Sequence, residues 1–111
     1  MRPLIKRAMF ERIEREIAAY DVVLYLRGSA AYPQCSFSAY AVQILSQLGI
    51  KFRDVNITED GELRQALKDY ADWPIFPQLY VHGEFIGDAN ILREMAEAGE
   101  LETLLTEREI P

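Results

Sequence analysis

An uncharged run of five residues, Val22-Val23-Leu24-Tyr25-Leu26, narrows the folds open to this chain more than any other feature. The run has no polar face to turn toward water, so a strand formed from it must be covered on both sides, as in a parallel or mixed sheet. A helical pattern follows over 36–48, and Phe52 to Ile57 alternates as a second strand. A strand, a helix and a strand in this order predict a parallel pair joined by a crossover.

The rest of the chain adds helices and a hairpin. Ile13 and Ile17 belong to an apolar stripe with a period of four, which predicts an N-terminal helix within residues 1–20. The other expected elements are a helix through 63–70, a hairpin of 78–81 and 84–86, a helix that follows an Asp88 N-cap, and a short helix over 101–106. This order predicts an α/β, thioredoxin-like fold: a four-stranded mixed sheet with helices on both faces and an extra N-terminal helix. We expect one domain over 1–111, with its core at about 21–105.

Composition excludes several classes of protein. Asp and Glu number 18 against 12 Lys and Arg, and this balance argues against a general binder of nucleic acid or of anionic membranes. No apolar run approaches the ~18 residues that span a bilayer, and charges recur too often near the N-terminus for an export signal. A single cysteine cannot close an intramolecular disulfide. We therefore expect a cytoplasmic protein with a free thiol.

That thiol, Cys35, lies where the loop after the first strand becomes a helix. The N–H groups at a helix N-terminus favour an anion, so we expect a depressed pKa and a role as nucleophile or soft-metal ligand. Arg27 and Arg64 are candidates to add positive potential. The alternative is an inert core thiol, because free cysteine is among the most buried residue types. Position alone leaves both interpretations open.

A second candidate feature is Phe76-Pro77, which opens a strand. If this peptide bond is cis, the N–H and C=O of Phe76 are free to bind an extended peptide ligand. The alternative is an ordinary trans proline at the first position of a strand, which the rarity of cis bonds favours.

These segments together resemble the monothiol glutaredoxins of the Cys-Gly-Phe-Ser type. The resemblance runs from about Asp21 to Leu105. Its motifs are Arg27-Gly28-Ser29, Pro33-Gln34-Cys35-Ser36-Phe37-Ser38, Val42-Gln43-Ile44-Leu45, Trp73-Pro74, Phe76-Pro77-Gln78 and Gly83-Glu84-Phe85-Ile86-Gly87. The eight-residue step from Arg27 to Cys35 matches the long loop of this family. The resemblance favours a reactive Cys35 and a cis Pro77.

The resemblance implies a glutathione site beside Cys35. Arg27 and Arg64 would pair with the glycine carboxylate of the tripeptide. Phe76, held by the cis Pro77, would bind the cysteinyl unit through its backbone. Ala89 and Asn90 would receive the γ-glutamyl end at a helix start.

The resemblance also implies a [2Fe–2S] cluster that bridges a homodimer. Cys35 and one glutathione from each protomer would supply its four thiolates. The expected function is cluster storage and transfer and redox homeostasis, with a BolA-like protein and apo iron–sulfur recipients as partners. The alternative is a glutathione-dependent oxidoreductase that removes glutathione from mixed disulfides by a monothiol mechanism. An adaptor without a cofactor is a third interpretation.

The chain departs from the family pattern at several positions near this site, and Ile75 for threonine and Arg27 for lysine are two of them. Ser36 stands where the family has glycine, and Gly87-Asp88-Ala89-Asn90 replaces Gly-Gly-x-Asp. The new carboxylate of Asp88 would either repel the carboxylate of the ligand or cap the following helix.

Overall fold

The computed structural model describes all residues, 1–111, and forms one mixed sheet covered by helices on both faces. Its elements are α1 (Pro3–Ala19), β1 (Val22–Leu26), α2 (Ser36–Gln47), β2 (Arg53–Asn56), α3 (Gly61–Ala71), β3 (Gln78–Val81), β4 (Glu84–Gly87), α4 (Ala89–Glu97) and α5 (Glu100–Glu107). The predicted helices, strands and hairpin are all present in the predicted order. None of the helices is both long and apolar enough to cross a membrane.

The sheet has the strand order β2-β1-β3-β4. β1 and β2 are parallel, with Val23 opposite Arg53, as the strand–helix–strand pattern predicts. β3 runs antiparallel to β1 and β4, and Gln78 lies opposite Tyr25. The central position of β1 explains why all five of its residues are buried.

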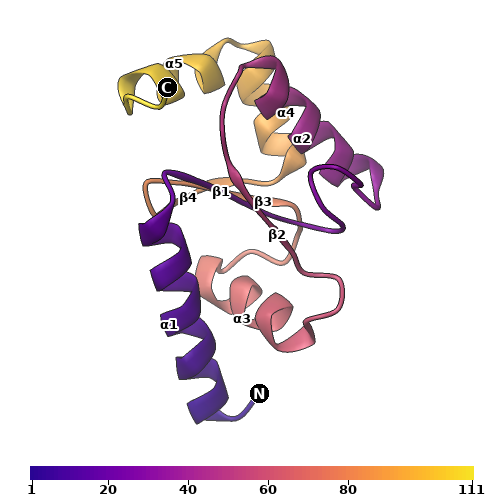
Figure 1. Cartoon of the computed structure of the whole chain (residues 1–111), viewed down its shortest axis with the longest axis vertical. Helices are drawn as coiled ribbons and strands as arrows, with labels where there is room; N and C mark the ends of the chain where they lie inside the picture. The colour runs from indigo at the N-terminus through magenta and orange to yellow at the C-terminus, as the bar shows by residue number, and fades with distance from the viewer.

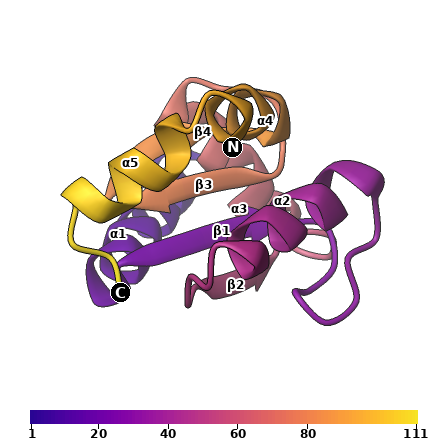
Figure 2. The same ribbon diagram turned by 90° about the horizontal axis from the view of Figure 1, so that it is seen from above.

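The strands separate two hydrophobic cores, because successive side chains point to opposite faces of the sheet. Val23, Tyr25 and Tyr80 pack with α1 and α3 on one face. Leu24, Leu26 and Leu79 pack against α2, α4 and α5 on the other. Figure 1 shows these two helical layers below and above the strands, and Figure 2 shows α2, α4 and α5 in front of the sheet.

The extra N-terminal helix is an integral part of the lower layer. Its apolar stripe buries Ile13 and Ile17 against the sheet. The hydroxyl of Tyr25 donates a hydrogen bond of 2.7 Å to Glu16, which joins α1 to the central strand. Burial, followed by this hydrogen bond and the charge of Glu16, raises the pKa of Tyr25 far above its ordinary value. Tyr25 therefore stays protonated and remains a donor.

Candidate functional site

Cys35 is the N-cap residue of α2. Its Sγ accepts a hydrogen bond of 3.3 Å from the N–H of Ser38 and lies 3.3 Å from the Ser38 hydroxyl oxygen. The thiol S–H donates to that hydroxyl, and after deprotonation the hydroxyl donates to the thiolate. Cys35 is half-buried, so its sulfur is not sealed in the core.

The surroundings of Cys35 stabilise its thiolate. Partial burial, the largest single influence, raises the pKa of the thiol. Hydrogen bonds from the Ser38 hydroxyl, from the N–H groups of Ser38 and Phe37, and then the charge of Arg27 act in the opposite direction. Together they hold the pKa of Cys35 below its ordinary value. This agrees with the prediction of a reactive thiol at a helix start and disfavours the inert core alternative.

The loop before Cys35 is fixed by hydrogen bonds to the end of β2. The N–H of Gly28 donates to Asn56 Oδ1 at 3.1 Å and to Thr58 Oγ1 at 3.2 Å. The N–H of Ala30 donates to Asp54 Oδ2 at 2.8 Å. Gly28 has φ +89°, and a Cβ there would lie 2.4 Å from the carbonyl oxygen of Tyr32. The chain thus folds tightly back on itself and delivers Cys35 to α2.

Arg27 and Arg64 lie around this loop in different environments. Arg27 is exposed at its start, and its charge lowers the pKa of Cys35. Arg64 is half-buried, and its Nη1 donates to the carbonyls of Ile57 at 3.2 Å and Thr58 at 3.3 Å. Thr58 also accepts from the N–H of Gly28, so it contacts both Arg64 and the residue that follows Arg27. Their pairing with a ligand carboxylate remains a prediction.

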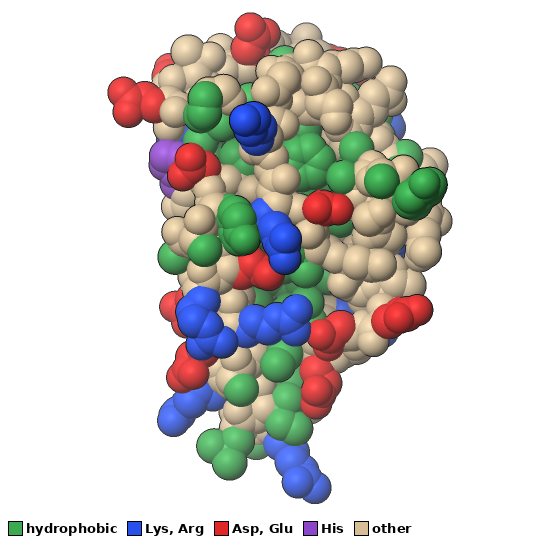
Figure 3. All heavy atoms as spheres, viewed as in Figure 1, with side chains coloured by type: hydrophobic (Ala, Val, Ile, Leu, Met, Phe, Trp, Pro, Cys, Tyr) green, Lys and Arg blue, Asp and Glu red, His purple; other side chains and the backbone are tan.

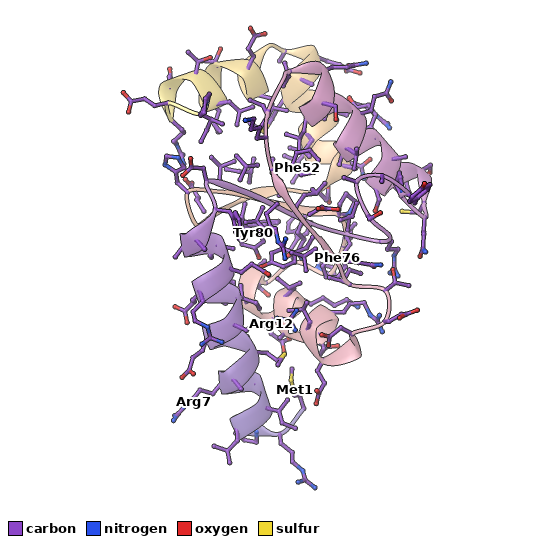
Figure 4. All side chains as sticks on the ribbon, viewed as in Figure 1. Met1, Arg7, Arg12, Phe52, Phe76 and Tyr80 are labelled. Carbon is purple, nitrogen blue, oxygen red and sulfur yellow. The ribbon has the colours of Figure 1, made fainter.

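The Phe76–Pro77 peptide bond is cis, as the resemblance implies. Both residues are buried, and Figure 4 shows Phe76 and Tyr80 in the layer between the sheet and the α1–α3 side. Phe76 precedes β3, and its N–H and C=O take part in none of the loop hydrogen bonds of the chain. The backbone of Phe76 therefore has a donor and an acceptor free for a peptide ligand.

The start of α4 holds the other two predicted site residues. Ala89, its first residue, is buried, and Asn90 is exposed. The Asp88 side chain is the N-cap and accepts from the N–H of Asn90 at 2.9 Å and that of Ile91 at 3.1 Å. Of the two roles considered for Asp88, the structure shows capping. The binding roles of Ala89 and Asn90 remain predictions.

Three polar residues that the sequence placed in family motifs, without assigning them a role, organise this region. Ser38 is fully buried beneath Cys35. Trp73 Nε1 donates to Asp88 Oδ2 at 2.9 Å. Gln78, also fully buried, donates from Nε2 to the Trp73 carbonyl at 3.1 Å and accepts from the Tyr80 hydroxyl at 3.1 Å. A local pattern hints at a role only for Ser38, which lies three residues after an N-cap; Trp73 and Gln78 stand in family motifs, but their partners are distant in the chain.

A separate cleft of about 470 Å³ lies at the opposite end of β1 from Cys35, lined by 19–22, 51–54 and 110–111. Cys35 follows the loop at the carboxyl end of that strand. The cleft therefore does not belong to the thiol site.

Comparison with known proteins identifies a family. A glutaredoxin family model matches residues 22–86. The chain is 46% identical over 102 residues to probable monothiol glutaredoxin 2 of Rickettsia conorii, covering 92% of this chain and 95% of the relative. It is 45% identical over 97 residues to glutaredoxin 4 of Escherichia coli K12, covering 87% and 84%.

Solved structures agree with this result. Reduced apo GrxS14 of poplar has a TM-score of 0.84 and 40% identity, with 95% of this chain and 96% of that chain covered. A buckwheat glutaredoxin–glutathione complex has a TM-score of 0.86 over 99% and 98% of the chains, and at 15% identity it supports the fold alone. The cis proline, the long loop, the lone thiol at the start of α2 and these likenesses lead to one conclusion. The chain belongs to the glutaredoxin family, with monothiol glutaredoxins among its relatives.

Proposed function

We propose that this protein is a glutathione-binding monothiol glutaredoxin that stores and transfers a [2Fe–2S] cluster shared between two copies of the chain. The observation that carries the proposal is the single activated thiol: Cys35 caps α2, touches Ser38 and has a lowered pKa. Thiolates are the ligands that iron–sulfur clusters require.

The surroundings of Cys35 suit an extended peptide with an anionic end. The backbone N–H and C=O of Phe76 are unpaired, and this residue lies next to the start of β3. Gln78 pairs with Tyr25, which brings that start beside the end of β1 and the loop that leads to Cys35. Arg27 and Arg64 lie around the same loop and suit a carboxylate. Glutathione has both the extended shape and the terminal carboxylate.

The donor atoms of the chain fit a shared cluster better than a cluster held by one chain. Cys35 is the one thiol of the chain. The chain has no group of three or more His, Cys, Asp or Glu side chains placed to bind a metal ion. A cluster on Cys35 must take its other thiolates from outside the chain. Two glutathiones and a second Cys35 complete a set of four. In this proposal the cluster is cargo, delivered to apo iron–sulfur proteins in the cytoplasm, with a BolA-like protein as a further partner.

Anaerobic reconstitution tests the proposal. The full chain is incubated with iron, sulfide and glutathione, and its visible absorption and solution mass are recorded together. We expect a coloured dimer that Cys35→Ser abolishes and that does not form without glutathione. Ser36→Ala, an exposed neighbour, is the matched control and should form the coloured dimer. A colourless monomer in the presence of all three components would contradict the proposal.

A second function, removal of glutathione from mixed disulfides, is favoured by the contact between Cys35 and Ser38. The Cys35 thiolate attacks the glutathione sulfur of the mixed disulfide and forms a new S–S bond. The S–S bond to the substrate breaks, and the released thiolate of the substrate takes up a proton. The thiolate of a second glutathione then attacks the Cys35 mixed disulfide. This step forms oxidised glutathione and restores the Cys35 thiolate.

A glutathione-coupled assay with a small mixed disulfide separates the two functions. The second function would be established if the cluster-free protein turns over the disulfide and the Cys35→Ser variant does not. Negligible turnover by the wild-type chain would exclude it as a main activity.

A further inference from the structure

Asp88 is a buried carboxylate held by N–H groups alone. It is 2% exposed, and none of the ion pairs of the chain includes it. Oδ1 accepts from the N–H groups of Asn90 at 2.9 Å and Ile91 at 3.1 Å. Oδ2 accepts from Trp73 Nε1 at 2.9 Å. Both side-chain oxygens of Asp88 must accept hydrogen bonds. A carboxylate therefore suits this position, and a carboxamide does not, because its NH₂ group would face an N–H donor.

Asp88 directly follows β4, and this position brings it next to Phe76 and Pro77, where the proposed peptide ligand binds. Gly87 lies opposite Leu79 in the β3–β4 pair. Asp88 therefore leaves β4 beside the start of β3, which directly follows Phe76–Pro77. The bond to Trp73 ties it to the same connection between α3 and β3. A peptide that binds the backbone of Phe76 and continues toward α4 meets Asp88.

The buried carboxylate already does what an anionic ligand group would do at this helix start. The first N–H groups of α4 have their acceptor, and the positive end of the helix has its negative charge. A second carboxylate arriving there would have to displace Asp88 from three N–H donors or stay beside a like charge without them.

We propose that Asp88 is a specificity-determining residue that replaces the ligand carboxylate at the start of α4. This inference rests on the proposed glutathione function. The site then selects cysteine-containing peptides by their thiol and by the carboxyl-terminal carboxylate near Arg27, and it gains little from a γ-glutamyl carboxylate. Its ligand class includes shorter thiol peptides as well as glutathione.

Thiol–disulfide exchange at equilibrium tests the proposal on the full-length chain. The protein is equilibrated with reduced and oxidised glutathione, and separately with reduced and oxidised cysteinylglycine, which lacks the γ-glutamyl unit. In each case the Cys35 thiol displaces one thiol from the disulfide and forms a mixed disulfide. Acid quenching and intact mass then give the two equilibrium constants. Their ratio is compared between variants, so intrinsic differences between the two thiols cancel.

We expect Asp88→Gly to raise the glutathione-to-cysteinylglycine ratio at least fivefold, because it frees the α4 N–H groups for the γ-glutamyl carboxylate. Asp88→Ser keeps a neutral N-cap, and therefore a folded α4, and should change the ratio in the same direction. Glu94→Gln removes one exposed negative charge from the same helix and should leave the ratio unchanged.

A ratio that rises less than fivefold in both folded Asp88 variants would overturn this inference and leave the glutathione function intact. The inference is overturned in the same way if Glu94→Gln raises the ratio as much as the Asp88 variants do. If Cys35 forms no mixed disulfide with either peptide, the proposed glutathione function fails, and this inference fails with it.

Discussion

Ser38 connects the reactive thiol to the loop that carries Arg27. Its hydroxyl oxygen accepts from the N–H of Arg27 at 3.1 Å and lies 3.3 Å from the sulfur of Cys35. Because the Arg27 N–H takes one lone pair, the hydroxyl proton is free to point at the thiolate. Ser38 therefore couples the position of the loop to the charge state of Cys35.

Replacing Ser38 with alanine should raise the pKa of Cys35, since the thiolate loses its hydroxyl donor. The loss corresponds to about 1.4 kcal/mol, or about tenfold slower alkylation by iodoacetamide at neutral pH. Thiolate absorbance against pH measures the same change. Ser46→Ala, at an exposed position on the same helix, is the control and should react like the wild type. Equal reactivity of Ser38→Ala and the wild type would show that the hydroxyl does not stabilise the thiolate.

Gly28 is the other single residue on which the site depends. Its φ of +89° disfavours a side chain, and a Cβ would lie 2.4 Å from the Tyr32 carbonyl oxygen and 2.7 Å from the Gln34 nitrogen. Gly28→Ala should lower the free energy of unfolding by about 3 kcal/mol, as measured by urea denaturation. Gly83 has a φ of +78° but open space around it, so Gly83→Ala should cost only about 1 kcal/mol. Equal losses in both variants would show that the close approach at Gly28 is unimportant.

The two helices of the lower layer are joined to each other through a cap. Asp60 is the N-cap of α3 and accepts from the N–H of Leu63 at 3.0 Å. Its other oxygen pairs with Nη1 of Arg12, on α1, at 2.9 Å. The hydrogen bond from the Leu63 N–H is the largest influence on the pKa of Asp60 and lowers it. Partial burial raises this pKa, but the charges of Arg12 and Arg64 also lower it, and the pKa lies below its ordinary value.

Asp60→Ala should lower the free energy of unfolding by about 1 kcal/mol at neutral pH. A carboxyl with a lowered folded-state pKa contributes stability above its unfolded pKa and loses it as the pH falls through the folded value. The difference between wild type and Asp60→Ala should therefore shrink in acid, below the ordinary aspartate range. Urea denaturation across that range measures it. Glu62→Ala, at an exposed position on the same helix, is the control and should show a small difference at every pH. A constant difference for Asp60→Ala would contradict the expectation.

The chain as a whole is acidic, whereas the charged side chain that acts on the thiol is basic. The chain carries a net charge of −6, and Figure 3 shows acidic and basic side chains interspersed over one face. Arg27 lowers the pKa of Cys35, and Thr58 connects Arg64 to the N–H of Gly28, the residue after Arg27. Charges beyond about 8–10 Å are largely screened in physiological salt, so the nearby arginines should dominate for an anionic reagent.

Added salt should therefore slow the reaction of Cys35 with oxidised glutathione, by about two- to threefold between low and physiological ionic strength. Repulsion by the net charge would produce the opposite trend and accelerate the reaction. The neutral reagent hydroxyethyl disulfide should show little dependence on salt. Arg27→Gln should reduce the slope of rate against salt concentration, and Arg7→Gln, at an exposed position on α1, should not. Stopped-flow kinetics at several salt concentrations show whether added salt slows or accelerates the reaction.

Features that depend on residues close together in the chain could be predicted from the amino-acid sequence. The run Val22–Leu26 predicted a fully buried strand, and Asp88 was predicted as the cap of the following helix through chemistry within one turn. The position of Cys35 at a helix start was also visible, and its lowered pKa follows from that position. These predictions succeeded because periodicity and capping act over a few residues.

Which polar groups from different segments meet depends on how the segments pack. Trp73 reaches Asp88 across 15 residues, and the Arg27 N–H reaches the Ser38 hydroxyl across 11. Arg64 turns its Nη1 toward the carbonyls of Ile57 and Thr58. The Trp73–Asp88 contact depends on the β3–β4 pair, which brings the connection before β3 beside the start of α4, and no local pattern encodes that. The sequence therefore located the thiol and the Asp88 cap, and tertiary packing brought the Arg27 N–H to the Ser38 hydroxyl and Trp73 to Asp88.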